Sequence, residues 1–353
     1  PRVVKCPGFL VIETWYPLCG RSPTPTGQKR SAFMFGIRKS RAVVGLDIGS
    51  SAIKAIELKP SGKRFEVTAF ASQPLPPESI VDGAIIDAGA VSAAIRRLFE
   101  QTSFSTKEVA ASLSGSAVIV KKITLPAMTD VELAESIQWE AEQYIPFDIQ
   151  DVNLDYQILE SGPKAEANGS MDVLLVAAKR GMIADYTAVI SQAGRVPVIV
   201  DVDAFAVQNA YEANYTSEHD AVVVLLNAGA SAINLNIVSG GQSLFTRDIS
   251  IGGNAYTEAV QKELNLPFAA AEQVKKGEAI DGVSFDDVKP VLHAVTETVL
   301  LEIKKTFDFF KATAASDRID RILLSGGASL VDGFPQALEE RFSAPVETFD
   351  PFR

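Results

Sequence analysis

Three short stretches of this sequence place small and polar residues where they could hold phosphate groups. In the first, DIGSS, the acid Asp47 is followed by Gly49, Ser50 and Ser51, with apolar runs on both sides. This pattern predicts two strands joined by a tight turn, which can present free backbone N–H groups to an anion. Asp47 would then lie where a hydrated divalent cation beside the anion needs a carboxylate. Ordinary hairpins also use such turns, so this stretch alone is not specific.

The same unit begins again at Ala221. The run AVVVLLNAGASAINLNIVSGGQSLFTRDIS predicts a strand, a small-residue turn, a second strand, a Gly-Gly turn and a third strand. Its first turn contains Gly229, Ala230 and Ser231, and Asn227 occupies the place of the acid. Two such units facing each other would form a cleft in which both turns could bind an anion.

The third stretch, RILLSGGASLVDGF at 321–334, predicts a buried strand, then Gly326 and Gly327, then a helix from about Ser329. Because these glycines have no Cβ atom, their backbone can approach a flat ring closely. Glycine pairs before helices are also routine turns. Only the three stretches together are specific.

The surrounding elements indicate how these stretches are positioned. Residues 42–67 predict a hairpin and a third strand, with KPSGK at 59–63 as the second turn. A helix is predicted at about 87–102, where apolar residues recur at helical spacing. VIVDVDAFAVQNAYEAN at 198–214 predicts a strand followed by a helix.

Residues 109–178 predict a separate α+β module between the two units. Its expected strands are EVAASLSG, AVIVKKITLP, VNLDYQILE and MDVLLVAAK. Its one helix is expected to open at Thr129, because Thr129 and Glu132 match a capping box in which each side chain bonds the other residue's free N–H. Pro146 limits the far end of this helix.

Composition narrows the class of protein. The chain has 353 residues, 47% of them hydrophobic, and a formal net charge of −11, which argues against binding to nucleic acid. The sequence has no run of about 18 apolar residues, which a transmembrane helix would need. We therefore expect a soluble protein. Both cysteines lie within residues 1–33, which excludes a disulfide framework or zinc site elsewhere. His219 and His293 lack the spacing of metal ligands.

The order of phosphate hairpin, connecting helix, second phosphate hairpin and Gly-Gly loop resembles the superfold of actin, Hsp70 and the sugar kinases. Within it, FGIRKSRAVVGLDIGSSAIKAIEL, EAEQYIPFD, DVDAFAVQNAY and LLSGGASLVDGF resemble the PilM family of FtsA-like proteins in type IV pilus assembly. The resemblance extends from Met34 to the end of the sequence. It implies an α/β class, with a duplicated actin-like ATPase-type fold and an inserted FtsA-like (SHS2) α+β subdomain.

The resemblance also implies domain boundaries. Residues 1–33 start without methionine and match no signal peptide, so we expect them to be non-native or disordered, with Met34 as the native start. Because the family continues beyond Arg353, we expect a truncated C-terminus. The expected parts are 34–108 with 179–217 as the first actin-like half, 109–178 as the inserted subdomain, and 218–353 as the second half, with its smaller subdomain around 253–290.

Carried over to this sequence, the family's site would bind ATP and Mg²⁺. Glu272 and Lys275 would touch the nucleoside, although a solvated helix face with a weak surface pair is the alternative. Lys54 is either a further ligand or simply an exposed strand lysine. The remaining implied contacts are Asp47 to Mg²⁺ through water, Gly49, Ser50 and Ser51 as the first phosphate turn, Asn227, Gly229, Ala230 and Ser231 as the second, and Gly326, Gly327 and Ala328 as the adenine loop.

One position departs from the nucleotide-hydrolysing relatives, whose second phosphate turn opens with Asp. Here the residue is Asn227, whose amide can bond a water but cannot take its proton. We therefore expect weak ATPase activity at most. Asp201 and Asp203 could help hold water or metal, but they also suit strand-end turns and helix caps.

The resemblance implies an ATP-binding adaptor in the cytoplasm that serves pilus biogenesis and twitching motility and couples its nucleotide state to partner binding. A short N-terminal peptide of the membrane protein PilN would bind beside the inserted subdomain, so the chain would reach the inner membrane only through partners. Trp139, Tyr144, Ile145 and Phe147 could line that groove or form the core of the module.

Two alternative functions remain. One is a phosphotransferase acting on a sugar or carboxylic acid, against which Asn227 argues, and the other is a filament-forming protein like FtsA. The filament would need a C-terminal amphipathic helix, whereas APVETFDPFR predicts a strand and a turn.

Overall fold

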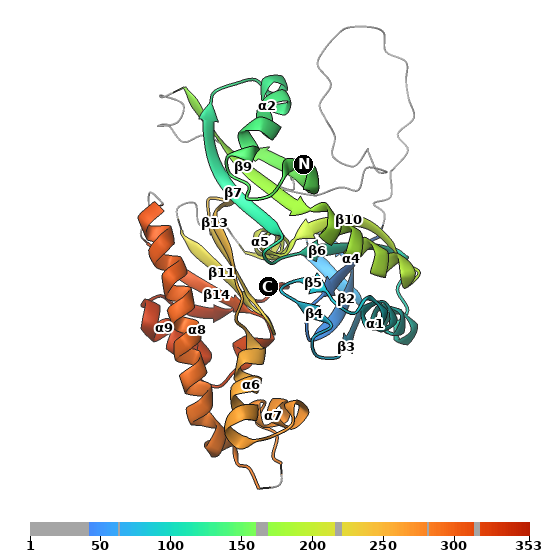
Figure 1. Ribbon diagram of the computed structural model, residues 1–353, viewed down its shortest axis with the longest axis vertical. Helices are drawn as coiled ribbons and strands as arrows, with labels where there is room; N and C mark the ends of the chain where they lie inside the picture. The colour runs from blue at the N-terminus through green and yellow to red at the C-terminus, as the bar shows by residue number, and fades with distance from the viewer. Residues whose placement is uncertain (1–41, 63, 160–168, 216–220, 281, 314–317) are drawn as a thin grey trace.

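The computed structural model describes residues 42–62, 64–159, 169–215, 221–280, 282–313 and 318–353. Two five-stranded sheets form the body, and a three-stranded sheet forms a separate module at one end (Figure 1). The predictions for residues 1–33 and His219 lie outside the described residues.

The first sheet has the strand order β3-β2-β1-β6-β10. β1, β2 and β3 form the predicted antiparallel meander, and β6 and β10 continue the sheet in parallel. Asp87 caps the predicted helix α1, which buries its apolar stripe against this sheet together with α4. A small hairpin of β4 and β5 follows β3. The bounds are β1 Val44–Ile48, β2 Ala52–Ser61, β3 Arg64–Pro74, β4 Ile80–Val81, β5 Ala84–Ile85, α1 Ala88–Gln101, β6 Glu108–Leu113, α4 Arg180–Gln192 and β10 Val196–Val202.

The strand β6 corrects one prediction, which assigned EVAASLSG to the inserted module. β6 instead lies between β1 and β10 in the first sheet. Its apolar side chains Val109, Ala111 and Leu113 are buried in the core of that sheet. The alternation of a short strand shows that one face is buried, but it does not identify the neighbouring strand.

The inserted module therefore builds its own sheet, in the order β7-β9-β8, from residues after β6. The helix α2 covers this sheet and buries Leu133 and Ile137 in a core separate from the other two sheets. The predicted capping box is confirmed, because Glu132 N–H donates to Thr129 Oγ1 at 3.3 Å and Thr129 N–H donates to Glu132 Oε2 at 2.7 Å. The bounds are β7 Val118–Pro126, α2 Asp130–Glu142, η1 Ile149–Asp151, β8 Val152–Ile158 and β9 Ser170–Lys179.

The second sheet has the order β13-β12-β11-β14-β15 and the same plan as the first, with an antiparallel meander followed by two parallel strands. The duplication predicted from the sequence is thus confirmed. The bounds are β11 Val223–Ala228, β12 Ile233–Ser239, β13 Gln242–Ile249, α6 Gly253–Leu264, α7 Phe268–Lys275, α8 Phe285–Thr313, β14 Arg321–Ser325, η2 Gly327–Leu330, α9 Phe334–Phe342 and β15 Val346–Thr348.

The helix predicted from about Ser329 begins later than expected. Residues after β14 form the short 3-10 helix η2, and α9 starts only at Phe334. Gly333 has a left-handed backbone with φ of 75°, which a continuous α-helix cannot contain. The prediction placed the glycine pair correctly but missed this second interruption.

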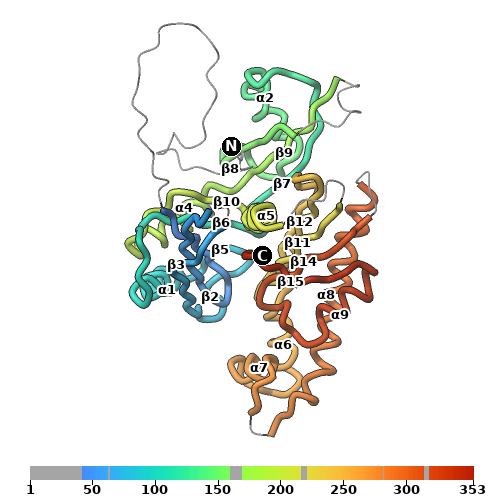
Figure 2. Tube along the Cα trace, turned by 180° about the vertical axis from the view of Figure 1, so that it is seen from behind, coloured from blue at the N-terminus to red at the C-terminus, as the bar shows by residue number. Residues whose placement is uncertain are grey.

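The helix α5 (Asp203–Asn214) joins the two halves. It follows β10 of the first sheet, and both views place it between the two five-stranded sheets (Figure 1, Figure 2). Asn236 on β12 donates to Gln208 Oε1 at 3.0 Å and to Ala204 O at 3.1 Å. Tyr211 packs against β11 and β14. The connecting helix is therefore fixed to the second half by buried polar and apolar contacts.

Candidate functional site

A cleft of about 1490 Å³ opens between the two halves of the molecule. The β1–β2 turn lines it from the first half, and the β11–β12 turn, the start of η2 and the helices α6 and α7 line it from the second. The structure brings all the predicted site residues to this one cleft: Asp47, Gly49, Ser50, Ser51, Lys54, Asn227, Gly229, Ala230, Ser231, Glu272, Lys275, Gly326, Gly327 and Ala328.

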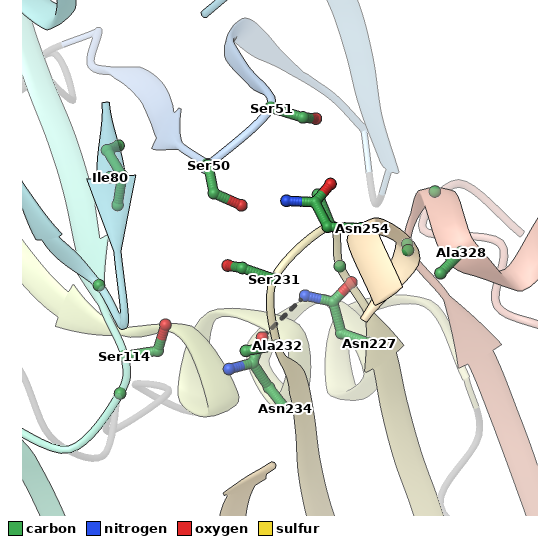
Figure 3. A pocket seen from close by; sticks show the side chains of 18 of the residues that line it. Ser50, Ser51, Ile80, Ser114, Asn227, Ser231, Ala232, Asn234, Asn254 and Ala328 are labelled. Carbon is green, nitrogen blue, oxygen red and sulfur yellow. Dashed lines mark hydrogen bonds between the residues drawn. The ribbon is translucent and has the colours of Figure 1, made fainter. Parts of the chain in front are cut away.

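The first turn presents two serines beside an exposed ion pair. Asp47 and Lys54 are directly opposite each other on β1 and β2, and Lys54 Nζ lies 2.9 Å from Asp47 Oδ2. The side chain of Ser50 points into the space between the halves, toward Asn254 (Figure 3). A carboxylate with a movable lysine partner, next to two hydroxyls, can accommodate a hydrated cation and the phosphate beside it.

The second turn is held rigidly by the start of α6. Gly229 N–H donates to Ala232 O at 2.9 Å, which closes the turn. Gly253 N–H donates to Gly229 O at 2.9 Å, and Asn254 N–H donates to Ala230 O at 2.7 Å. These contacts require a glycine just before the helix, because a Cβ atom on Gly252 would lie 2.5 Å from Gly229 O.

The two glycines of the third stretch differ in what surrounds their missing side chains. Gly326 has φ of 87°, and a Cβ there would lie 2.2 Å from Ala228 O, so the fold itself requires glycine. A Cβ on Gly327 would meet nothing within 4 Å. Because Gly327 lines the cleft, its bare backbone is available to a ligand rather than occupied by the protein.

Glu272 and Lys275 do not form the solvated pair that was the alternative prediction. Lys275 is 10% exposed, and its Nζ lies 2.6 Å from Glu272 Oε2 and donates to Thr257 Oγ1 at 2.9 Å and to Gly253 O at 3.1 Å. Burial would raise the pKa of Glu272, but hydrogen bonds from Lys275 and Thr257 outweigh it and hold this pKa below its ordinary value. Burial lowers the pKa of Lys275. The pair thus ties α7 to the start of α6 at the wall of the cleft.

The structure adds a half-buried acid whose role the sequence left open. Asp203, the first residue of α5, lines the cleft and accepts hydrogen bonds from Ser112 Oγ and Ser114. Burial raises the pKa of Asp203, and the nearby charges of Asp47 and Asp248 raise it further. Asp201 is buried, but it is not among the residues lining the cleft.

The negative charges around Asp203 bear on the predicted Mg²⁺. Among the described residues, no group of three or more His, Cys, Asp or Glu side chains could hold a metal directly. The charges of Asp47 and Asp248 nevertheless reach Asp203 and raise its pKa. This donor set fits a cation that keeps most of its water ligands, as Mg²⁺ does.

Sequence reasoning also missed Asn234, Asp248 and Asn254 in the cleft. A signal for the first was available, since INLNIV places polar residues within an apolar strand and Asn234 is only 8% exposed. Buried amides of this kind need partners, which marks them as parts of a network.

The four residues proposed for a peptide groove separate into two kinds. Ile145 is buried in the core of the inserted module, and Tyr144 and Phe147 pack against that core. Trp139 on α2 is 73% exposed. The core alternative therefore accounts for three of these four residues, and Trp139 stays a candidate contact.

Two facing copies of one strand–turn–strand unit, with a glycine loop beside the second, define an actin-like α/β protein. Among solved structures, the chain is similar to ethanolamine utilization protein EutJ from Carboxydothermus hydrogenoformans, with 16% identity, a TM-score of 0.53, and 89% of this chain and 86% of that one covered. A PilM-PilN type IV pilus biogenesis complex contains a chain with 29% identity and a TM-score of 0.77, and 88% of each chain is covered. The model of the family described as Type IV pilus assembly protein PilM matches residues 45–353. The chain belongs to the PilM family.

Proposed function

We propose that this chain is an ATP-binding adaptor of the type IV pilus assembly complex. The observation that carries the proposal is the convergence of two phosphate-type turns and the open backbone of Gly327 on a single cleft. The turns at Ser50 and Ser231 would bind the phosphates, Asp47 would hold Mg²⁺ through water, and Glu272 with Lys275 would contact the nucleoside. The bound Mg²⁺ would neutralise phosphate and carboxylate charge.

The site favours binding over fast hydrolysis. Asn227 donates from Nδ2 to Asn234 Oδ1 at 3.1 Å, and its Oδ1 accepts from Ser325 Oγ at 3.4 Å. Its amide is therefore committed to neighbouring side chains, and an amide is not a general base at neutral pH. Nucleotide would act here as a ligand that sets the closure of the cleft, with weak turnover at most.

The partner in this proposal is the N-terminal cytoplasmic peptide of PilN. The similar chain in the PilM-PilN complex supports it. No helix among the described residues is both long enough and apolar enough to cross a bilayer. Attachment to the inner membrane from the cytoplasm through PilN, in a system that serves twitching motility, is part of the same proposal.

The nucleotide part of the proposal is tested by Gly327→Val, with Gly181→Val as the matched control. Both positions have open space for a side chain in the free protein, but only Gly327 lines the cleft. Titration calorimetry with Mg-ATP should show at least about a tenfold loss of affinity for G327V, or about 1.4 kcal/mol, and unchanged affinity for G181V. Equal affinities of the two variants for Mg-ATP would show that the adenine ring does not bind against this loop.

The partner part is tested by fluorescence anisotropy with a labelled peptide from the N-terminus of PilN of the same pilus system. Saturable binding by the full chain is the expected result. A chain that binds Mg-ATP but not the peptide would overturn the adaptor and favour the phosphotransferase alternative.

A further inference from the structure

A row of polar side chains crosses the second sheet at its cleft end, one residue from each of four neighbouring strands. Ser325 on β14 is opposite Asn227 on β11, which is opposite Asn234 on β12, which is opposite Asp248 on β13. Directly opposite residues project from the same face of a sheet, so the four side chains form one line. Figure 3 shows its middle, where Asn227 bonds Asn234 beside the second phosphate turn.

The donors and acceptors in this row have a fixed direction. At one end, Asn234 donates from Nδ2 to Asp248 Oδ1 at 2.8 Å, and a carboxylate is an acceptor. This turns Asn234 Oδ1 toward Asn227, which donates to it at 3.1 Å and leaves its own Oδ1 for Ser325. The carboxylate of Asp248 on β13 thus sets the orientation of the Asn227 amide at the second phosphate turn, two strands away on β11.

The other oxygen of Asp248 reaches across to the first half. Asp248 Oδ2 accepts from the backbone N–H of Gly115 at 2.5 Å. Gly115 lies in the loop between β6 and β7, shortly before the first strand of the inserted module. β13 and β7 also lie side by side (Figure 1). One carboxylate therefore joins the phosphate turn of the second half to the base of the module.

The loop around Gly115 is packed too tightly to absorb a displacement. Gly115 has φ of 92°, and a Cβ there would lie 2.7 Å from Asp82 O. A Cβ on Gly83, in the facing turn, would lie 2.6 Å from Ser114 O. Close-packed contacts of this kind transmit a shift to the next element instead of damping it.

We propose that Asp248 is a positioning residue that couples the second phosphate turn to the inserted module. This inference rests on the proposed function of the cleft and names the route by which nucleotide would affect the partner. A phosphate bound at Gly229–Ser231 shifts the Asn227–Asn234–Asp248 row, and the Asp248–Gly115 contact passes the shift to the module. By linkage, the PilN peptide changes nucleotide affinity by the same factor.

The test exchanges one atom type within the row. In Asn234→Asp, two carboxylates face each other where an amide donated to Asp248 at 2.8 Å, so the row is broken without a change in side-chain size. In the double variant Asn234→Asp/Asp248→Asn, the carboxylate at position 234 accepts from Asn227 and from the new amide at 248. That amide's oxygen accepts from Gly115, so every hydrogen bond and the net charge are restored.

The measured quantity is the Kd of the full chain for the labelled PilN peptide, without nucleotide and at saturating Mg-ATP. We expect the wild-type ratio of these two Kd values to differ from one by at least about fivefold, the lower end of typical coupling. The ratio should approach one in N234D and return to the wild-type value in the double variant. Hydrogen exchange of the 112–118 segment should respond to Mg-ATP in the wild type and in the double variant, but not in N234D.

The outcomes separate this inference from the proposed function. If the wild type binds both ligands and N234D keeps the wild-type ratio, or the double variant fails to restore it, the role of Asp248 is wrong and the adaptor stands. If the wild type binds both ligands independently, the coupling is likewise overturned. If the wild type does not bind Mg-ATP, the proposed function fails and the inference fails with it.

Discussion

Replacing Asp201 with asparagine should stabilise this protein at neutral pH. Asp201 is 6% exposed, and burial raises its pKa from 3.8 to about 7, with a smaller contribution from the charge of Asp203. The Val202 N–H that donates to Asp201 Oδ1 at 2.8 Å lowers this pKa but does not offset burial. An asparagine keeps that acceptor and removes the charge, so the substitution isolates the cost of ionising a buried acid.

The sign and size of the effect follow from linkage. Between pH 4 and 7 the unfolded chain has lost this proton and the folded chain retains it, so stability falls as pH rises through this window. A shift from 3.8 to about 7 corresponds to roughly 4 kcal/mol at about 1.36 kcal/mol per unit. Above about pH 7 both states are ionised and the full cost is present. Below pH 4 both are protonated and the cost disappears.

Urea unfolding of the wild type, D201N and the exposed-site control D185N at pH 4.5, 6 and 8 would measure this. The stability of D201N relative to the wild type should grow from about 1 kcal/mol at pH 4.5 toward roughly 4 kcal/mol at pH 8, while D185N should show no such trend. A pH-independent difference between D201N and the wild type would refute the argument, because it would mean that Asp201 is already ionised in the folded protein at low pH.

Two further predictions concern the cleft and the module. Lys54→Ala should weaken Mg-ATP binding in calorimetry while shifting stability by at most about 1 kcal/mol, because both side chains of its ion pair with Asp47 are about half exposed; a large loss of stability would show that the pair is structural. Leu133→Ala, in the separate core of the module, should cost about 2–5 kcal/mol, seen as faster hydrogen exchange in β7, β8 and β9, with Mg-ATP affinity kept. A parallel loss of Mg-ATP affinity would mean that the module and the nucleotide cleft do not fold as separate units.

Much of the fold followed from local pattern. The meander from Val44 and its repeat from Val223 were predicted because apolar runs and small-residue turns recur in the same order. The capping box at Thr129 was predicted because its hydrogen bonds join residues three apart. The predicted placement of β6 in the inserted module was wrong, because the local pattern of a strand does not show which strands will pair with it.

For the candidate site, too, the residues of the turns were predictable from the sequence, whereas their separate roles were not. Glycine at 326 and 327 was visible in the sequence, but only the three-dimensional environment separates Gly326, which the fold requires, from Gly327, which faces the cleft. Asp248 was missed because its partners, Asn234 and Gly115, come from a neighbouring strand and from the other half of the chain.

Local sequence is enough to specify the repeated strand–turn–strand units and the residue types at each turn, since these depend on backbone preferences and on neighbours a few positions away. Which turns face each other, which acids are buried, and how Asp248 comes to join the two halves depend on the folded chain. Hydrogen bonds, desolvation and charge repulsion act over a few ångströms in space, whereas Gly115 and Asp248 are 133 residues apart along the chain.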